Sequence, residues 1–294
     1  MINTLIQGVL LGGYYALIAA GLSFMFSVMR VINLAHGSLA VLAAFALLWL
    51  AKTFGLSPFL GLIIVLPAMA VLGVLLQRLV LDRAMRAGQL VPILATFGLA
   101  VVIDNALFEG FGANTQSLGN FIGSLSYDSI QLPGTNIYVG ELAVGVFVLA
   151  VVVLGGLQLF LSFTPYGRAI LATAEDPDTA GLVGINPRRA TAVATAIAMV
   201  TVGLAGAALG MRGTFDAYSG ELQLLFAFEA AVIGGAGSVW GTLIGGIVLA
   251  LAQSIGASIS PLAFLIGGHG VFLIVLFVRI WLAGGVAGLI RRHA

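Results

Sequence analysis

The sequence predicts an all-α fold, a polytopic transmembrane helical bundle with about eight to nine spans, some of them broken or re-entrant. Three observations lead to this prediction. Of the 294 residues, 61% are hydrophobic and only 8% are charged, whereas soluble domains contain about 25% charged residues. The mean hydropathy is +1.15. The apolar residues form continuous runs, not the alternating segments of roughly ten residues that build a transmembrane β-barrel.

The spans are placed by apolar runs that polar or Gly/Pro clusters interrupt. In chain order, these runs are 5–28, 36–51, 58–80, 90–110, 139–162, 190–211, 223–234, 239–257 and 262–283. A transmembrane helix needs about 20 residues. The runs 36–51 and 223–234 are short for a full span, so we expect each to be broken or re-entrant and shielded by other protein. Residues 1–294 are expected to form a single transmembrane domain.

Lysine and arginine are distributed unevenly between the connections on the two sides. If successive spans alternate in direction, one set contains Arg30, Arg78, Arg83, Arg86, Arg168, Arg188, Arg189, Arg279, Arg291 and Arg292. The other set contains only Lys52 and Arg212. Cytoplasmic loops carry an excess of basic residues, so the first set and the C-terminus are predicted to be cytoplasmic and the N-terminus outside. This alternation requires the short run 223–234 to cross the membrane.

Glycine is unusually abundant, with 40 residues in the chain, where about 7% is the average. Several glycines lie four residues apart: Gly8/Gly12, Gly206/Gly210, Gly237/Gly241/Gly245 and Gly284/Gly288. This spacing places small residues on one helix face, where helix backbones can approach closely. We therefore predict tight helix packing at these positions.

One polar connection, residues 165–189, has an organised pattern. Asp176 precedes Pro177 and is predicted to cap a short helix over 177–183. Asp178 adds a favourable negative charge to the first turn. Gly184 is predicted to end this helix, and the next span is expected to open after Asn186. The residues alone leave open a solvated loop whose arginines only fix the topology.

Two charged residues fall inside predicted spans, where charge is costly and marks a functional candidate. Asp104 lies in LAVVIDNALFEG, and Glu229 lies in LLFAFEAAVIGG. Each carboxylate either lines a translocation pathway or is satisfied by a neighbouring helix or a water-filled vestibule. If both carried coupling ions, the chain would be an ion-coupled secondary transporter, which is the alternative function.

Further polar and glycine residues are candidates for the pathway. Asn33 and His36 lie between the first two spans and either line an inner gate or bond backbone carbonyls near a helix break. Gly234, Gly235 and Gly237 could break a helix and present amide groups to a substrate carboxylate. The alternative for these glycines is close packing at a subunit interface.

Several function classes are excluded. A net charge of +1 does not suit nucleic-acid binding through a basic face, and without cysteine no disulfide or thiolate-bound metal can form. His269 and His293 have no further ligands at metal spacing, so no metal site is predicted. No Ser–His–Asp pattern is present, and Lys52, the one lysine, follows no glycine-rich phosphate loop. The chain is therefore predicted not to be an enzyme.

Five segments carry a family resemblance in the family's own order. They are QGVLLGGYYAL at 7–17, VINLAHG at 31–37, GRAILATAED at 167–176, AGLVGIN at 180–186 and AAVIGGAGSVWGTLIGG at 230–246. The pair at 167–186 resembles the cytoplasmic coupling loop of ABC importer permeases. The whole set resembles the branched-chain amino acid permeases, and the length is similar to the shorter of their two permease subunits.

This resemblance implies a permease subunit that moves amino acids inward, branched-chain or similarly small apolar ones, by alternating access. It implies a second homologous permease chain, two cytoplasmic ATPase subunits and an external substrate-binding protein as partners, in a bacterial plasma (inner) membrane. ATP and Mg²⁺ would then bind to partner subunits, and this chain would carry no cofactor. Urea, short amides and aromatic acids are also open as substrates, since proteins of this family carry them as well. Asp104 and Glu229 depart from the family pattern, which leaves the exact substrate open.

The resemblance also implies that the segment 165–189 couples the permease to its ATPases. The residues it assigns to this coupling are Arg168, Glu175, Asp176, Asp178, Gly181 and Gly184.

Overall fold

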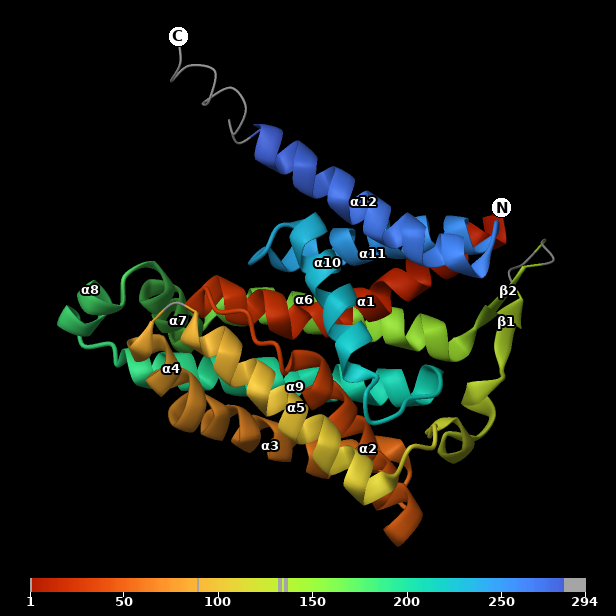
Figure 1. Cartoon of the computed structure of the whole chain (residues 1–294), viewed down its shortest axis with the longest axis horizontal. Coiled ribbons are helices and arrows are strands. Elements are labelled where there is room, and N and C mark those ends of the chain that lie inside the picture. The colour runs from red at the N-terminus through yellow and green to blue at the C-terminus, as the bar shows by residue number, and fades with distance from the viewer. Residues whose placement is uncertain (1, 89, 132–133, 135–136, 283–294) are drawn as a thin grey trace.

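The computed structural model describes residues 2–88, 90–131, 134 and 137–282 and is almost entirely helical (Figure 1). The α-helices are α1 (Ile2–Met29), α2 (His36–Phe54), α3 (Pro58–Leu76), α4 (Asp82–Ala87), α5 (Val91–Phe111), α6 (Glu141–Phe163), α7 (Pro165–Glu175), α8 (Pro177–Leu182), α9 (Pro187–Arg212), α10 (Gly220–Gly234), α11 (Val239–Ala257) and α12 (Pro261–Leu282). A π-helix, Gln77–Leu81, joins α3 to α4. In the described residues, eight helices are long and apolar enough to cross a membrane, which confirms the polytopic helical bundle.

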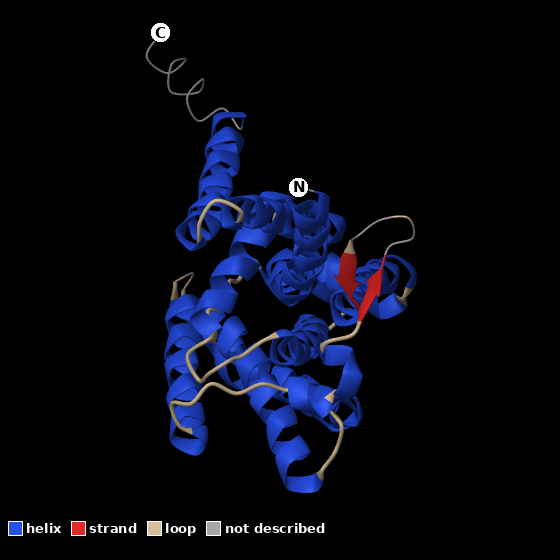
Figure 2. Ribbon diagram, turned by 90° about the vertical axis from the view of Figure 1, so that its right-hand side faces the viewer, coloured by secondary structure: helices blue, strands red, loops and turns tan. Residues whose placement is uncertain are grey.

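The long connection after α5 contains the strands of this fold. It begins with two 3₁₀ turns, Gly119–Phe121 and Gly123–Ser126. The strands β1 (Ser129–Gln131) and β2 (Tyr138–Gly140) then pair antiparallel, with Ser129 opposite Gly140. Figure 2 looks at this end of the molecule and shows the two strands at the rim of the bundle. The prediction did not include this hairpin, which adds six strand residues to an otherwise helical fold.

Five helices begin with the same local device, a polar capping residue followed by proline. The side chain of the first residue accepts a backbone N–H from the first helical turn, while proline supplies the helical φ angle without needing a partner for an N–H. These pairs are Ser57–Pro58, Thr164–Pro165, Asp176–Pro177, Asn186–Pro187 and Ser260–Pro261. The helix starts near the two ends of the bundle are thus encoded locally.

The bundle has two distinct ends. At one end, here the hairpin end, lie β1 and β2 (Figure 1, right). There Gln7 donates to the carbonyl oxygen of Tyr138 at 3.3 Å and Lys52 donates to Gln116 at 2.7 Å. At the other, here the α8 end, the predicted basic residues Arg30, Arg86 and Arg188 line one cavity. The described residues thus fit the predicted alternation, and Arg291 and Arg292 lie outside them, as do Gly284, Gly288 and His293.

The helix over the run 223–234 is α10, with 15 residues. It is about 22 Å long, less than the roughly 30 Å of a bilayer core, and it is not among the eight long apolar helices. Phe215, just before it, pairs with Gln116 near the hairpin end. Gly237, just after it, donates to Ser23 in the last third of α1. The chain therefore still passes from one end of the bundle towards the other through a short helix and its flanking turns.

The run 36–51 contains no break, because it lies in α2, one continuous helix of 19 residues that is long enough to cross a membrane. The non-helical stretch lies before it. Residues 30–35 are not helical, and Arg30 has a left-handed φ of 55°. His36, the first residue of α2, donates from Nε2 to the carbonyl oxygen of Ile18, which belongs to the middle of α1. The chain thus returns from the end of α1 towards mid-membrane before α2 begins.

Helices α1, α2 and α9 form the buried centre, whereas α3, α5, α6 and α12 expose apolar side chains. The predicted close packing at glycine is confirmed within the chain. A Cβ on Gly12 would lie 2.4 Å from the Cα of Ile247, and one on Gly245 would lie 2.0 Å from the carbonyl oxygen of Ala230. Real Cβ atoms do not come this close, so these glycines allow α11 to contact both α1 and α10 directly.

Candidate functional site

The coupling segment consists of two consecutive helices, α7 and α8. Asp176 accepts the backbone N–H groups of Asp178 and Thr179 at 3.0 and 3.1 Å, which confirms it as the cap of α8. The helix ends at Leu182, one residue before the predicted end, and Gly184 follows with a left-handed φ of 85°. The prediction missed α7, although Thr164 before Pro165 is the same signal as Asp176 before Pro177.

The far end of α8 is apolar and unusually exposed. Leu182 and Val183 are 88% and 72% exposed, while Ala180 is buried and holds the helix against the rest of the chain. The other residues assigned to coupling, Arg168, Glu175, Asp178 and Gly181, are also exposed. An apolar tip with charged surroundings has the composition of a docking surface for another protein.

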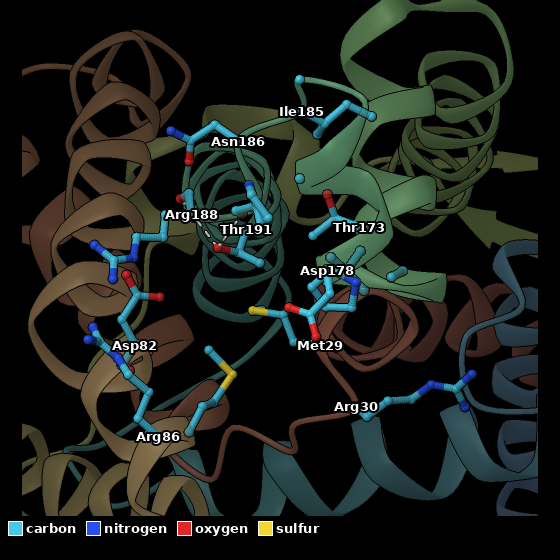
Figure 3. A pocket seen from close by; sticks show the side chains of 17 residues that line it. Met29, Arg30, Asp82, Arg86, Thr173, Asp178, Ile185, Asn186, Arg188 and Thr191 are labelled. Atoms are coloured by element: carbon cyan, nitrogen blue, oxygen red, sulfur yellow. Dashed lines mark hydrogen bonds between the residues drawn. The ribbon is translucent and has the colours of Figure 1, made fainter.

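A cavity of about 980 Å³ lies between α8 and the bundle (Figure 3). Pro177, Asp178 and Gly181 of α8 line one side of it. Its other walls come from the end of α1, from α4 and from the first turn of α9, residues 28–30, 82–86 and 187–191. Because this space is not filled by packed side chains, α8 has room to move relative to α1 and α4.

Because Asp176 caps α8, replacing or protonating its side chain should change the stability of α8. The side chain and backbone of Thr179 hold the pKa of Asp176 below its ordinary value. Asp176→Ala should loosen α8 and weaken coupling, whereas Asp176→Asn keeps a capping oxygen and should behave almost as wild type. Gly184→Val should do worse than Asp176→Ala, since a β-branched residue resists the left-handed backbone. Substrate-stimulated ATP hydrolysis by the reconstituted complex measures this.

The pH dependence follows from the direction of that shift. A depressed pKa stabilises the capped helix above the ordinary pKa, and the stabilisation is lost only as the pH falls through the lower folded-state pKa. Coupling through α8 should therefore stay constant from about pH 8 down to about pH 5. A titration of coupling in the neutral range that disappears in Asp176→Asn would contradict this assignment.

The break between α1 and α2 gathers the predicted polar pair in the buried centre. Asn33 and His36 are fully buried. The side-chain oxygen of Asn33 accepts the N–H of Ala35 at 3.0 Å, and Thr96 of α5 accepts the N–H of Leu34 at 3.0 Å. Within the described residues, Asn33 Nδ2 and His36 Nδ1 have no hydrogen-bond partner. The pair therefore shapes the break, and these two nitrogen atoms are available to a ligand.

Asp104 lies beside this break. It is half-buried on α5, where it interacts with Ser38 in the first turn of α2 and faces the charge of Glu221 on α10. Glu221 is not among the predicted site residues, since a glutamate in a first helical turn is also an ordinary stabilising residue. The signal that could have found it is its position at the edge of a short apolar run.

A second cavity of about 670 Å³ lies beside the break between α1 and α2. Glu221 lines it together with Ile32 and Leu34 of the break, Ile93 of α5, and Tyr218, Leu222, Leu224, Leu225 and Phe228 around α10. The start of α10 packs on the start of α2, because a Cβ on Gly37 would lie 1.9 Å from the carbonyl oxygen of Gly220. The cavity is thus lined mostly by apolar side chains. The carboxylate of Glu221 lies where α2 and α10 both begin.

Glu229, the other predicted charge, faces a different partner. Its Oε1 lies 2.5 Å from Nδ1 of His269 on α12, and Glu229 itself is almost fully buried. Within the described residues, its Oε2 has no hydrogen-bond partner. Glu229 therefore does not line the cavity that Glu221 lines. Its contact with His269 instead joins α10 to α12.

The glycines at 234–237 make close contacts inside the chain. A Cβ on Gly234 would lie 1.9 Å from the carbonyl oxygen of Gly241, so α10 and α11 touch there. Gly235 and Gly237 have φ angles of 96° and 92° and form the turn between these helices. Their amides donate to the carbonyl oxygen of Val232 and to Ser23 Oγ. Both amides already have acceptors, and a role in binding a substrate carboxylate stays a prediction.

Several known proteins are similar to this chain over most of its length. The chain is 30% identical over 272 residues, 88% of its length and 87% of the relative's, to the high-affinity branched-chain amino acid transport system permease protein BraD of Pseudomonas aeruginosa. It is 27% identical to the corresponding protein LivH of Escherichia coli K12, over 87% of this chain and 86% of the relative. It is also 29% identical to a probable LivH of Methanocaldococcus jannaschii, over 92% and 88%.

A family model also matches nearly the whole chain. Residues 4–284 match the family described as "Branched-chain amino acid transport system / permease component". This range contains the eight long apolar helices, the break before α2, and the coupling segment. The chain is a multi-pass membrane protein and belongs to the branched-chain amino acid transport permease family.

Proposed function

We propose that this chain is a membrane-spanning permease subunit of an ABC importer that moves branched-chain amino acids inward by alternating access. The observation that carries the proposal is the capped, exposed helix α8, which presents Leu182 and Val183 away from the bundle beside an open cavity. Relatives that match over nearly the whole chain are named as permeases for these substrates. The partners are a second homologous permease chain, two ATPase subunits and an external binding protein.

The proposed orientation places the α8 end in the cytoplasm of a bacterial cell and the hairpin end outside the plasma (inner) membrane. The distribution of arginine supports it, because Arg30, Arg78, Arg83, Arg86, Arg188 and Arg189 line cavities at the α8 end. In this orientation ATP and Mg²⁺ bind to the partner ATPases under α8, and this chain holds no cofactor. Closure of the ATPases would push α7 and α8 into the cavity between α8 and the bundle. This movement would tilt α1, α4 and α9, which line that cavity.

The proposed pathway follows the face of α10 that includes Glu221. A charged side chain exposed at mid-membrane height cannot favourably face lipid. The second permease chain would therefore cover this face and leave the apolar cavity as part of the route. Its Leu and Phe side chains suit an aliphatic substrate, and the carboxylates of Glu221 and Asp104 suit the substrate's ammonium group.

Neutralising these carboxylates should change transport without unfolding the chain. We expect Asp104→Asn and Glu221→Gln each to lower leucine uptake about tenfold, the effect of losing one charged hydrogen bond. Glu109→Gln, an exposed change on the same helix as Asp104, is the matched control. Membrane expression and initial uptake rates in vesicles measure the effect.

Glu229→Gln is the companion variant, because Gln keeps a hydrogen-bonding group of similar size opposite His269. If Glu229 reports on substrate, this variant shifts uptake or substrate preference at normal expression. Normal uptake with unchanged selectivity in Asp104→Asn and Glu229→Gln would mean that both charges serve the fold.

The energy source that drives leucine uptake tests the proposed function. The purified complex in vesicles, supplied with binding protein and leucine, should take up leucine only with ATP and should tolerate a proton uncoupler. The chain without its ATPase subunits should be inactive. Uptake by the chain alone that collapses with the uncoupler would instead establish the ion-coupled alternative, in which Asp104 and Glu229 carry the coupling ion.

A further inference from the structure

Five arginines converge on one pocket at the α8 end of the bundle. The pocket has a volume of about 380 Å³ and is lined by Arg78, Arg83 and Arg86 around α4, by Arg188 and Arg189 in the first turn of α9, and by Asp82. Figure 3 shows part of this arrangement, with Asp82 and Arg86 on α4 and Arg188 on α9 at the same side of the neighbouring cavity. Two separate elements of the chain thus direct positive charge to the same place.

This positive charge is not balanced within the described residues. Asp82 is the one carboxylate in the pocket lining, and its Oδ1 already accepts from Gln77 at 2.7 Å. Arg83 and Arg86 donate to the backbone carbonyl oxygens of Leu79 and Asp82, at 3.4 and 2.9 Å. In the described part of the chain, no carboxylate lies within ion-pair distance of any of the five guanidinium groups. Such a cluster of like charges favours a bound anion.

The pocket is held rigid by buried polar contacts. Gln77 is fully buried in the π-helix between α3 and α4. Its side-chain nitrogen donates to Asp82, and its side-chain oxygen accepts from Thr195 of α9 at 2.7 Å. This bridge fixes α4 relative to α9, and with them the arginines on each side. π-helical segments of this kind are frequent at functional sites.

The surroundings select the kind of anion. Beside the pocket, α3 and the π-helix that follows it expose the apolar side chains of Val71, Leu75 and Leu79, which are four residues apart along the chain. A ligand with a phosphate group and acyl chains can satisfy both surfaces, because its phosphate would meet the arginines while its chains lie along α3. Basic pockets between helices at the cytoplasmic side are a recurrent form of anionic lipid site.

We propose that the pocket formed by Arg78, Arg83, Arg86, Arg188 and Arg189 binds the headgroup of an anionic phospholipid. The bound phosphate joins α4 to the first turn of α9, the helix that directly follows the coupling segment. The lipid thereby fixes the base from which α7 and α8 extend. This inference rests on the proposed orientation, which places the pocket in the anionic cytoplasmic leaflet.

The test measures which lipid the protein retains. The full chain is purified with its partner subunits in a neutral detergent, mixed with micelles that contain phosphatidylglycerol or phosphatidylcholine, and separated by gel filtration before the bound lipid is quantified. Phosphatidylglycerol should be retained over phosphatidylcholine. Arg83→Gln combined with Arg189→Gln should weaken this retention about thirtyfold, the effect of two basic side chains at a lipid surface.

Two further variants separate local binding from general charge and from folding. Arg30→Gln combined with Arg168→Gln removes the same charge at the same end of the bundle, outside the pocket, and should retain phosphatidylglycerol as wild type does. Arg83→Lys combined with Arg189→Lys preserves the point charges and should keep most of the retention, provided that the variant elutes as a folded complex.

Three results would overturn the proposal. The first is equal retention of both lipids by the wild type, or unchanged retention in the Arg83→Gln, Arg189→Gln variant. The second is displacement of the lipid by equimolar inorganic phosphate, which would make the pocket a site for free phosphate. The third is a variant that keeps its lipid but loses its ATPase subunits, which would make the pocket a protein contact. Since none of these readouts measures uptake, they are independent of whether leucine is the substrate.

Discussion

Leu182→Asp should abolish ATP-driven uptake while the chain stays folded and inserted. Leu182 is 88% exposed at the tip of α8, so a polar replacement there costs the isolated chain little stability. If an ATPase subunit covers the tip, the new carboxylate would be buried without a partner, which weakens association strongly. We expect uptake to fall at least about tenfold, with a parallel loss of co-purified ATPase.

Leu182→Met is the matched control, because it keeps an apolar side chain of similar volume and should retain uptake and ATPase binding. A Leu182→Asp variant that transports at the wild-type rate would show that the tip of α8 does not contact the ATPase. Loss of expression in Leu182→Asp alone would show that the tip instead packs within the membrane protein.

Gly37→Val should prevent folding. A Cβ on Gly37 would lie 1.9 Å from the carbonyl oxygen of Gly220, and 2.9 Å from the backbone nitrogen of Leu224. These are backbone atoms at the place where α2 and α10 both begin, so no side chain can rotate away. Overpacking of this kind costs about 3 kcal/mol or more.

The measurement is the yield and melting temperature of the purified chain. Gly98→Val on α5 serves as the control, because Gly98 is exposed and no atom lies within 4 Å of an added Cβ. Gly98→Val should stay close to wild type, whereas Gly37→Val should not yield a monodisperse protein. Wild-type stability of Gly37→Val would mean that the two helix starts do not meet at this point.

Much of the fold could be predicted because its determinants are local. The apolar runs predict the long helices by length alone, and Asp176 followed by Pro177 predicts the start of α8 with its hydrogen bonds. Four other helices begin with the same pair of signals, including α7, which the prediction missed. The run 36–51 looks short for a span, yet it forms one continuous helix of 19 residues, because α2 extends to Phe54.

The missing parts depend on contacts between residues far apart in the chain. Glu229 and His269 are 40 residues apart, and no periodicity indicates that α10 and α12 face each other there. Gln77 and Thr195 are 118 residues apart and look unremarkable in their own helices, although they join α4 to α9. Glu221 was missed for a different reason, because its charge is explained equally well by the first turn of a helix.

The most direct test of the central claim is a cross-link from the tip of α8 to an ATPase subunit. The chain contains no cysteine, so Leu182→Cys introduces a single thiol that can carry a photoreactive benzophenone maleimide. We predict that illumination of the reconstituted complex joins this position to an ATPase subunit, whereas Leu262→Cys on α12, at the opposite end, does not. Absence of an ATPase adduct from Leu182→Cys, or equal adducts from both positions, would contradict the account.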